Sequence, residues 1–204
     1  MESFFDTLIK AIFIENIIFS FFLGMCSYLA VSKTVKTSMG LGIAVTFVLI
    51  ITAPLNWALN TYLLKAGALS WVGDAYKDVD LSYLSFIIFI ATIASMTQLV
   101  EMIVEKFAPA LYNSLGIFLP LIAVNCAILG VSLFMQEREY GFSDLIAFAL
   151  GSGIGWWLAI VTMAAIREKI RYSNVPKPLR GLGIAFILTG LMAIAFMSFM
   201  GIKI

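Results

Sequence analysis

Long apolar runs separated by short polar stretches follow one another along the whole chain. Each run is long enough to cross a bilayer as a helix, and the six lie at about residues 6–31, 39–64, 82–103, 110–135, 144–166 and 181–201. The first run carries Asp6 and Glu15 where a signal peptide would have basic residues, and no small-residue cleavage site follows a short apolar core. The pattern therefore predicts an all-α membrane protein with six transmembrane helices, forming one integral membrane domain over residues 1–204.

The loops predict the orientation, because Lys and Arg in short loops stay on the cytoplasmic side. Lys33 and Lys36 follow the first run, and five basic residues lie between 167 and 180, after the fifth run. The loops after the second and fourth runs, 65–81 and Glu137–Glu139, are acidic. We therefore expect both termini and the acidic loops on the periplasmic side of the membrane. Loop 65–81 is interpreted as a turn at the membrane surface.

The two halves of the chain are similar when Cys26 is aligned with Cys126. The next spans then correspond as well, since the glycine-containing Ser38–Gly42 matches Gly151–Gly155. Three spans per half is an odd number, so the second half enters the membrane from the opposite side and the repeat is inverted. The two repeats cover about residues 1–106 and about 107–204.

Inverted repeats often carry their working site near the bilayer midplane, on helices interrupted by Gly or Pro. Gly24 precedes Cys26, and Gly116, Pro120 and Gly130 flank Cys126. Counting about 1.5 Å per residue from the basic inner loop and the acidic outer loop puts both cysteines at nearly the same depth. We therefore expect broken helices 1 and 4, with the cysteines near the middle of the membrane.

Composition narrows the chemistry available. Apolar residues make up 62% of the chain and charged residues 12%, which excludes a soluble globular domain. The formal charge of +1 argues against a nucleic-acid partner. Histidine is absent from the sequence, and this excludes His-ligated haem, imidazole metal sites and histidine bases. No dinucleotide-binding glycine motif is present, so the chain alone should lack NADH or quinone chemistry.

Two thiols at one depth have three interpretations. They are packing residues, a disulfide, or ligands of a soft metal site. Zinc and iron–sulfur sites usually need four protein ligands, and Cys26 and Cys126 supply half of that number. A metal site here would therefore need a second protein chain with two more thiolates. Asn125 is a candidate to hydrogen-bond a cluster sulfur or to satisfy backbone groups freed by the break.

Ionisable residues inside the spans are further candidates. Glu15 lies within the first run, where we consider a cation contact or an ordinary polar contact. Glu101 and Glu105 share a helix face at the end of the third run and are candidates for an ion pathway. Pairing with Lys106 near the inner interface is the simpler explanation for both. The glycines of Gly151–Gly155 favour close helix approach.

Several motifs spread over nearly the whole chain carry a resemblance to a known family. They are residues 14–16, 20–26, 29–33, 35–38, 111–122, 125–127, 166–176 and 179–183. With these motifs the chain resembles the membrane subunits of the bacterial Na⁺-translocating NADH:quinone oxidoreductase, and the E-type subunit in particular. The A-type subunit of the related Rnf ferredoxin:NAD⁺ complex is the alternative within the same family.

The resemblance implies a place in a six-subunit complex of the bacterial inner membrane. It implies that Cys26 and Cys126 are ligands of a two-iron, two-sulfur (2Fe–2S) cluster shared with the D-type sister subunit, which brings two further cysteines. Electrons would pass from a cytoplasmic flavin protein that oxidises NADH toward covalently bound flavin and quinone, coupled to Na⁺ export. Flavins, NADH and quinone would be bound by other members of the complex, so the chain is not active alone.

A stand-alone inverted-repeat transporter, with Glu15 and the broken spans forming a substrate site, is the alternative from another class. Six spans make a small transporter. A half-complement of thiols is explained more readily by a partner protein.

Overall fold

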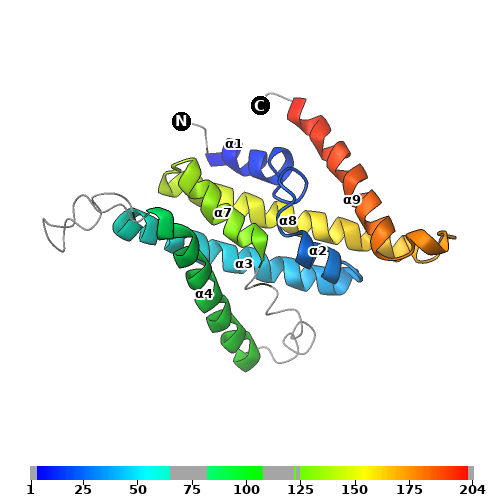
Figure 1. The fold of residues 1–204 in the computed structure, drawn as a ribbon, viewed down its shortest axis with the longest axis horizontal. Helices are drawn as coiled ribbons and strands as arrows, with labels where there is room; N and C mark the ends of the chain where they lie inside the picture. The colour runs from blue at the N-terminus through cyan, green and yellow to red at the C-terminus, as the bar shows by residue number, and fades with distance from the viewer. Residues whose placement is uncertain (1–3, 65–81, 108–121, 123–124, 202–204) are drawn as a thin grey trace, which may run out of the picture.

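The computed structural model describes residues 4–64, 82–107, 122 and 125–201 (Figure 1). Its elements are α1 (Phe4–Ile9), the π-helical turn η1 (Lys10–Ile14), α2 (Met25–Val31), α3 (Val35–Leu59) with a π-helical extension (Asn60–Leu64), a 3-10 turn (Ser82–Leu84), α4 (Ser85–Phe107), α7 (Cys126–Glu137), α8 (Phe142–Ile170), a 3-10 turn (Lys177–Leu179), α9 (Leu182–Met197) and a final 3-10 turn (Ser198–Gly201). The described residues contain helices and no strand, which confirms the all-α class.

Three helices in the described ranges are long and apolar enough to cross a membrane. They are Val35–Leu64, Ser85–Phe107 and Phe142–Ile170, and they match the second, third and fifth predicted spans. The shorter apolar helices α7 and α9 fall within the fourth and sixth. Loop 65–81 and the Gly116 and Pro120 positions lie outside the described residues. The complete six-span inverted repeat therefore stays a prediction.

The first apolar run is divided into two short helical pieces. Helix η1 ends at Ile14, and α2 begins only at Met25. Between them the fully buried Asn16 replaces the missing helical hydrogen bonds. Its Oδ1 accepts from the backbone N–H groups of Ile18 at 3.1 Å and Phe19 at 3.4 Å. The Nδ2 of the same side chain donates to the Gly155 carbonyl at 3.0 Å and so ties the break to α8.

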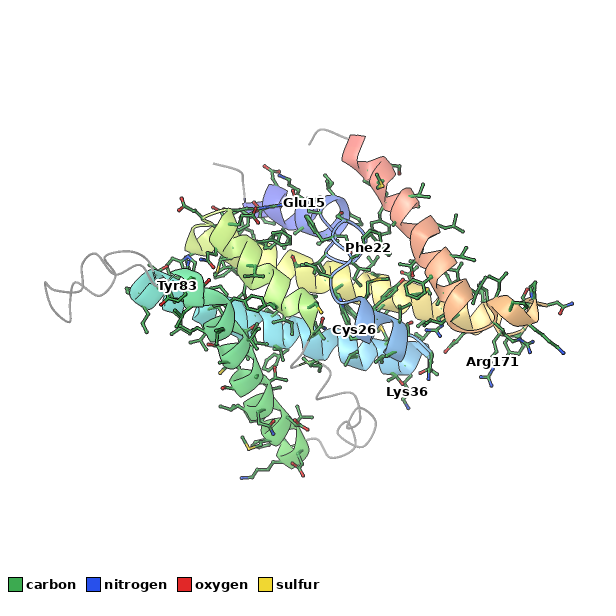
Figure 2. All side chains as sticks on the ribbon, viewed as in Figure 1. Glu15, Phe22, Cys26, Lys36, Tyr83 and Arg171 are labelled. Atoms are coloured by element: carbon green, nitrogen blue, oxygen red, sulfur yellow. The ribbon has the colours of Figure 1, made fainter. Side chains whose placement is uncertain are left out.

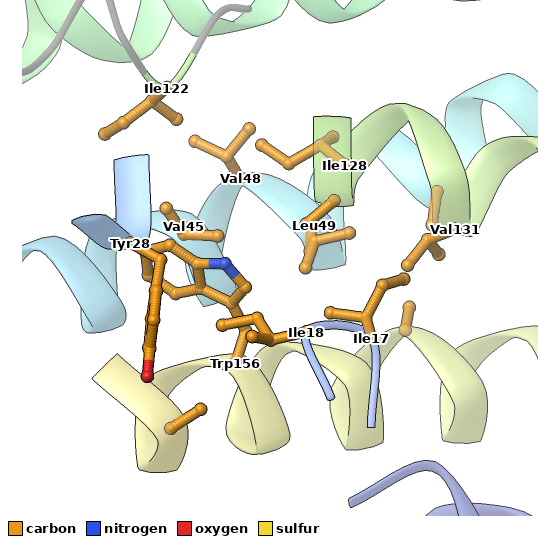
Figure 3. Packing of buried hydrophobic residues seen from close by; sticks show 14 of the residues in the cluster. Ile17, Ile18, Tyr28, Val45, Val48, Leu49, Ile122, Ile128, Val131 and Trp156 are labelled. Atoms are coloured by element: carbon orange, nitrogen blue, oxygen red, sulfur yellow. The ribbon is translucent and has the colours of Figure 1, made fainter. Parts of the chain in front are cut away.

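Helices α3 and α8 lie side by side and form the centre of the molecule (Figure 1). Trp156 and Tyr28, both fully buried, fill the space beside α2 together with aliphatic side chains (Figure 3). The first helical piece packs on α8 at Gly151, where an added Cβ would lie 2.7 Å from the Cβ of Ala11 and 2.8 Å from the Leu8 carbonyl oxygen. The prediction that the glycines of 151–155 permit close helix approach is therefore confirmed.

Hydrogen bonds between distant segments show which helix ends lie together. Arg167 Nη1 on α8 donates to the Leu29 carbonyl and to Ser32 Oγ, both at 2.9 Å. Figure 2 shows Lys36 and Arg171 at this same end of the molecule. At the far end of α3, Trp57 Nε1 donates to the Tyr140 carbonyl at 3.1 Å. The prediction that the two basic loops share one side, with the loop after the fourth run away from it, is confirmed for the described residues.

Candidate metal centre

Both cysteines stand at the start of a helix. Cys26 is the second residue of α2, and Cys126 is the first residue of α7. From their starting points near the middle of the molecule, the two helices run in opposite directions (Figure 1). Backbone N–H groups in a first helical turn have no acceptor within their own helix, so they are available to sulfur.

The local sequence explains why each helix begins where it does. Gly24 has φ +81°, a left-handed conformation that favours glycine, and its carbonyl then accepts the first helical hydrogen bond, from Tyr28 N at 3.1 Å. At α7 the N-cap is Asn125, whose Oδ1 accepts from the Ala127 backbone N–H at 3.0 Å. The Asn125 side chain thus satisfies a backbone donor freed at the helix start, one of the two predicted roles.

The two thiols lie next to each other although they are far apart in the sequence. The side chains of Cys126 and Cys26 are close enough to interact electrostatically, and the Gly24 backbone N–H lies near the Cys126 sulfur. Both cysteines are free, and both are exposed on the surface of this chain. Exposure of both thiols at one place does not fit the packing interpretation and leaves room for ligation from outside the chain.

Two buried N–H donors beside the thiols have no acceptor. They are Nδ2 of Asn125 and Nε1 of Trp156, neither of which has a partner in the part of the chain that the structure describes. The indole nitrogen would lie 2.7 Å from a Cβ placed on Gly24, so it sits directly under the turn that starts α2. A centre that binds negatively charged sulfur gains from such donors.

The donor set is half of what an iron–sulfur cluster needs. Within the described ranges, no group of three or more His, Cys, Asp or Glu side chains could hold a metal ion. Two neighbouring thiols with backbone N–H groups near one of them fit one side of a cluster whose other ligands come from elsewhere.

The predicted acidic candidates lie apart from one another. Glu15 forms an ion pair with Arg138, in the turn between α7 and α8, and a longer one with Lys10 at 3.7 Å. Burial disfavours the charge on Arg138, but hydrogen bonds with Glu15 and Tyr140 outweigh it and raise the pKa of the guanidinium. Glu101 is half-buried on α4, the helix that diverges from the rest (Figure 1).

The prediction that the two acids on α4 pair with Lys106 is wrong. Lys106 forms no ion pair with Glu101 or Glu105, all three of which the structure describes. Residues one and five positions apart on a helix do not face each other as residues three or four apart do, and the Lys106 side chain is exposed instead.

Sequence reasoning missed three features of this region. Arg138 is the partner of Glu15, and the only signal for it was the opposite charge of the two residues. Trp156 lies under the Gly24 turn, which no local pattern indicated. Phe22 is 56% exposed with φ +55°, an unusual conformation for an aromatic residue, four positions before Cys26 (Figure 2).

Comparison with known proteins gives the family of the chain. The family model described as Rnf-Nqr subunit, membrane protein, matches residues 4–203. The E subunit of the Na(+)-translocating NADH-quinone reductase of Methylococcus capsulatus is 57% identical over 204 residues, covering 100% of both chains. The proteins of the same name from Rhodopirellula baltica and Hahella chejuensis are 55% identical over 212 residues and 54% identical over 203 residues, and each match covers 100% of this chain and at least 99% of the relative.

These observations define a class of protein. It is a helical membrane chain in which two helix starts bring two cysteines together. The chain belongs to the Rnf-Nqr family of membrane subunits. Its full-length relatives named above are E subunits of a Na⁺-translocating NADH-quinone reductase, an oxidoreductase complex.

Proposed function

We propose that this chain is the E-type subunit of a Na⁺-translocating NADH:quinone reductase and carries electrons across the membrane. In this proposal Cys26 and Cys126 supply two of the four ligands of a 2Fe–2S cluster, and two cysteines of the D-type sister subunit complete it. The observation that carries the proposal is the proximity of two free, exposed thiols that come from two different helix starts. Relatives that match over their full length support the choice of complex.

A bound cluster would supply one-electron oxidation and reduction at this point. The chain's own residues would hold it and adjust its charge. The backbone N–H groups of Gly24 and Cys126 lie near one sulfur, and they would stabilise the added negative charge of a thiolate. The buried N–H groups of Asn125 and Trp156 would add donors from below. Exposure of both thiols leaves the opposite side open to the sister protein.

The inverted repeat is part of the same proposal. Helices α2 and α7 start beside each other and run in opposite directions, as related half-helices of an inverted repeat should. The basic loops at one end of the molecule support a cytoplasmic position for that end, with both termini periplasmic in the bacterial inner membrane. The thiols would then lie near the bilayer midplane, between a cytoplasmic electron donor and periplasmic flavin that leads to quinone.

For the Na⁺ coupling we propose different roles for the two acids. Glu15 forms ion pairs with Arg138 and Lys10, so two cations already balance its negative charge. We therefore assign Glu15 to stabilising the broken first span. Glu101 has no basic partner within the described chain and remains the candidate for contact with a passing cation.

The test is to replace each cysteine in the intact complex. Cys26→Ser and Cys126→Ser should each lose iron, acid-labile sulfide and the cluster EPR signal, while the complex still assembles because serine is close to cysteine in size and shape. Met25→Leu, which changes the neighbouring residue at the same helix start, should keep all three. An unchanged cluster signal in both cysteine variants would refute the assignment.

A further inference from the structure

A pocket lies where α8 ends and the chain turns into α9. Its volume is about 290 Å³, and its wall includes Arg167, Arg171 and Arg180 together with Ile170, Val175 and Ile184. Cationic groups and aliphatic side chains therefore share one small space. Neither the cysteine centre nor the electron relay uses any of these residues.

The arginines are available for an anion. The segment 167–180 contains five basic residues and one acid, Glu168. That acid already accepts a hydrogen bond from the Val35 backbone N–H at 3.0 Å. Among the described residues, no carboxylate pairs with any of the three arginines. Arg167 is held in place by the Leu29 carbonyl and Ser32 Oγ through one of its three nitrogen atoms.

The start of α9 adds backbone donors to the same pocket. Gly181 lines it and is the N-cap of this 16-residue helix, without a side-chain cap. The first backbone N–H groups of α9 therefore have no acceptor from a cap. A planar guanidinium group can donate two parallel hydrogen bonds to two oxygen atoms of a phosphate. The N-terminus of a helix also favours an anionic ligand of this kind.

The surroundings indicate where the rest of the ligand would lie. An apolar surface continues from the pocket along α9. Ile187, Leu191 and Ile194 lie on the same helix face as Ile184 of the pocket wall, and they are 47%, 59% and 67% exposed. This end of the molecule carries the basic loops, where the positive-inside rule places the cytoplasmic membrane surface. If the phosphate group of a lipid occupied the pocket, the acyl chains of that lipid would have room along α9.

We propose that this pocket binds the phosphate head group of an anionic phospholipid of the cytoplasmic leaflet. The three arginines would hold the phosphate oxygens, and the aliphatic wall and α9 would hold the glycerol backbone and the start of the acyl chains. A soluble phosphate compound shares the head-group chemistry but would not use the apolar face. The site is independent of the cysteine centre, so neither proposal depends on the other.

The experiment uses the purified whole complex in nanodiscs of phosphatidylcholine with increasing phosphatidylglycerol. The melting temperature should rise as phosphatidylglycerol is added. Arg171→Gln with Arg180→Gln should raise the phosphatidylglycerol fraction needed for the half-maximal rise by about tenfold, because two charged hydrogen-bonded contacts are lost. Lys169→Gln removes a charge from the same segment without touching the pocket and should change that fraction by less than about threefold.

Further arms separate the sources of the phosphate. Inorganic phosphate and glycerol 3-phosphate should not reproduce the rise at millimolar concentration. If they match phosphatidylglycerol, the lipid proposal is wrong and the pocket is a site for a soluble anion. If Lys169→Gln has the same effect as the arginine pair, general surface charge explains the binding and the pocket does not. Single Arg180→Gln, at an exposed residue, keeps the test open should the double variant fail to assemble.

Discussion

The turn at Gly24 starts the helix that carries the first cysteine, and Gly24→Ala tests how tightly it is built. An alanine at φ +81° would be in the left-handed region, at a cost of about 1–2 kcal/mol. Its Cβ would lie 2.7 Å from Trp156 Nε1 and 3.0 Å from both the Ala127 Cβ and the Asn125 Oδ1. Because Trp156 is fully buried, it has little room to move, and overpacking adds about 1–3 kcal/mol. The expected loss of stability is therefore about 2–5 kcal/mol.

Unfolding of the purified protein in mixed micelles of increasing SDS fraction, followed by circular dichroism, measures this loss. Another glycine of the same chain serves as a control. Gly190 lies within α9, where an added Cβ would meet no atom within 4 Å, so Gly190→Ala should be neutral or stabilise by up to about 1 kcal/mol. The reasoning fails if Gly24→Ala costs no more than the backbone contribution alone, about 1–2 kcal/mol.

Three further substitutions have defined outcomes in the same SDS titration. Asn16→Leu should destabilise by about 2–4 kcal/mol, because it leaves two buried backbone N–H groups without an acceptor and removes the hydrogen bond to α8, and an unchanged midpoint would contradict this account. Asn125→Ala should cost about 1 kcal/mol by removing the cap of α7, whereas Asn125→Asp should retain most of the cap. Arg138→Met should cost about 1–2 kcal/mol by leaving Glu15 with a single distant cation, and the loss should shrink in high salt if the ion pair is responsible.

The parts of the fold that follow from local composition were predictable. The three long spans are predictable because, in a bilayer, the backbone N–H and C=O groups of about twenty consecutive apolar residues find hydrogen-bond partners within the segment only if it is a helix. The two basic loops are placed at the same end of the molecule by their Lys and Arg content alone, because the preference of basic residues for the cytoplasmic side holds for each short loop by itself. Gly151–Gly155 was interpreted correctly because small residues matter wherever backbones approach.

Features that depend on distant partners were not predictable. The ion pair of Glu15 with Arg138 joins residues on different helical segments, and the pairing expected for Glu101 and Glu105 with Lys106 is absent among the described residues. The exact limits of the first break also depend on tertiary contact, since Asn16 holds it through the Gly155 carbonyl on α8. Hydropathy reports only that such a segment is apolar.

The sequence by itself determined that this is a helical membrane chain without histidine, with two cysteines and with basic loops on one side. Those properties depend on residue type and spacing, because the bilayer acts on each segment as a solvent. Only the tertiary structure decided that the two thiols lie close together, that both are exposed, and that the Gly24 backbone N–H lies near the second sulfur. The two cysteines lie about one hundred positions apart. Packing of α7 against α3 and α8, and contacts of the α2 segment with Trp156 and Arg167 of α8, bring them together.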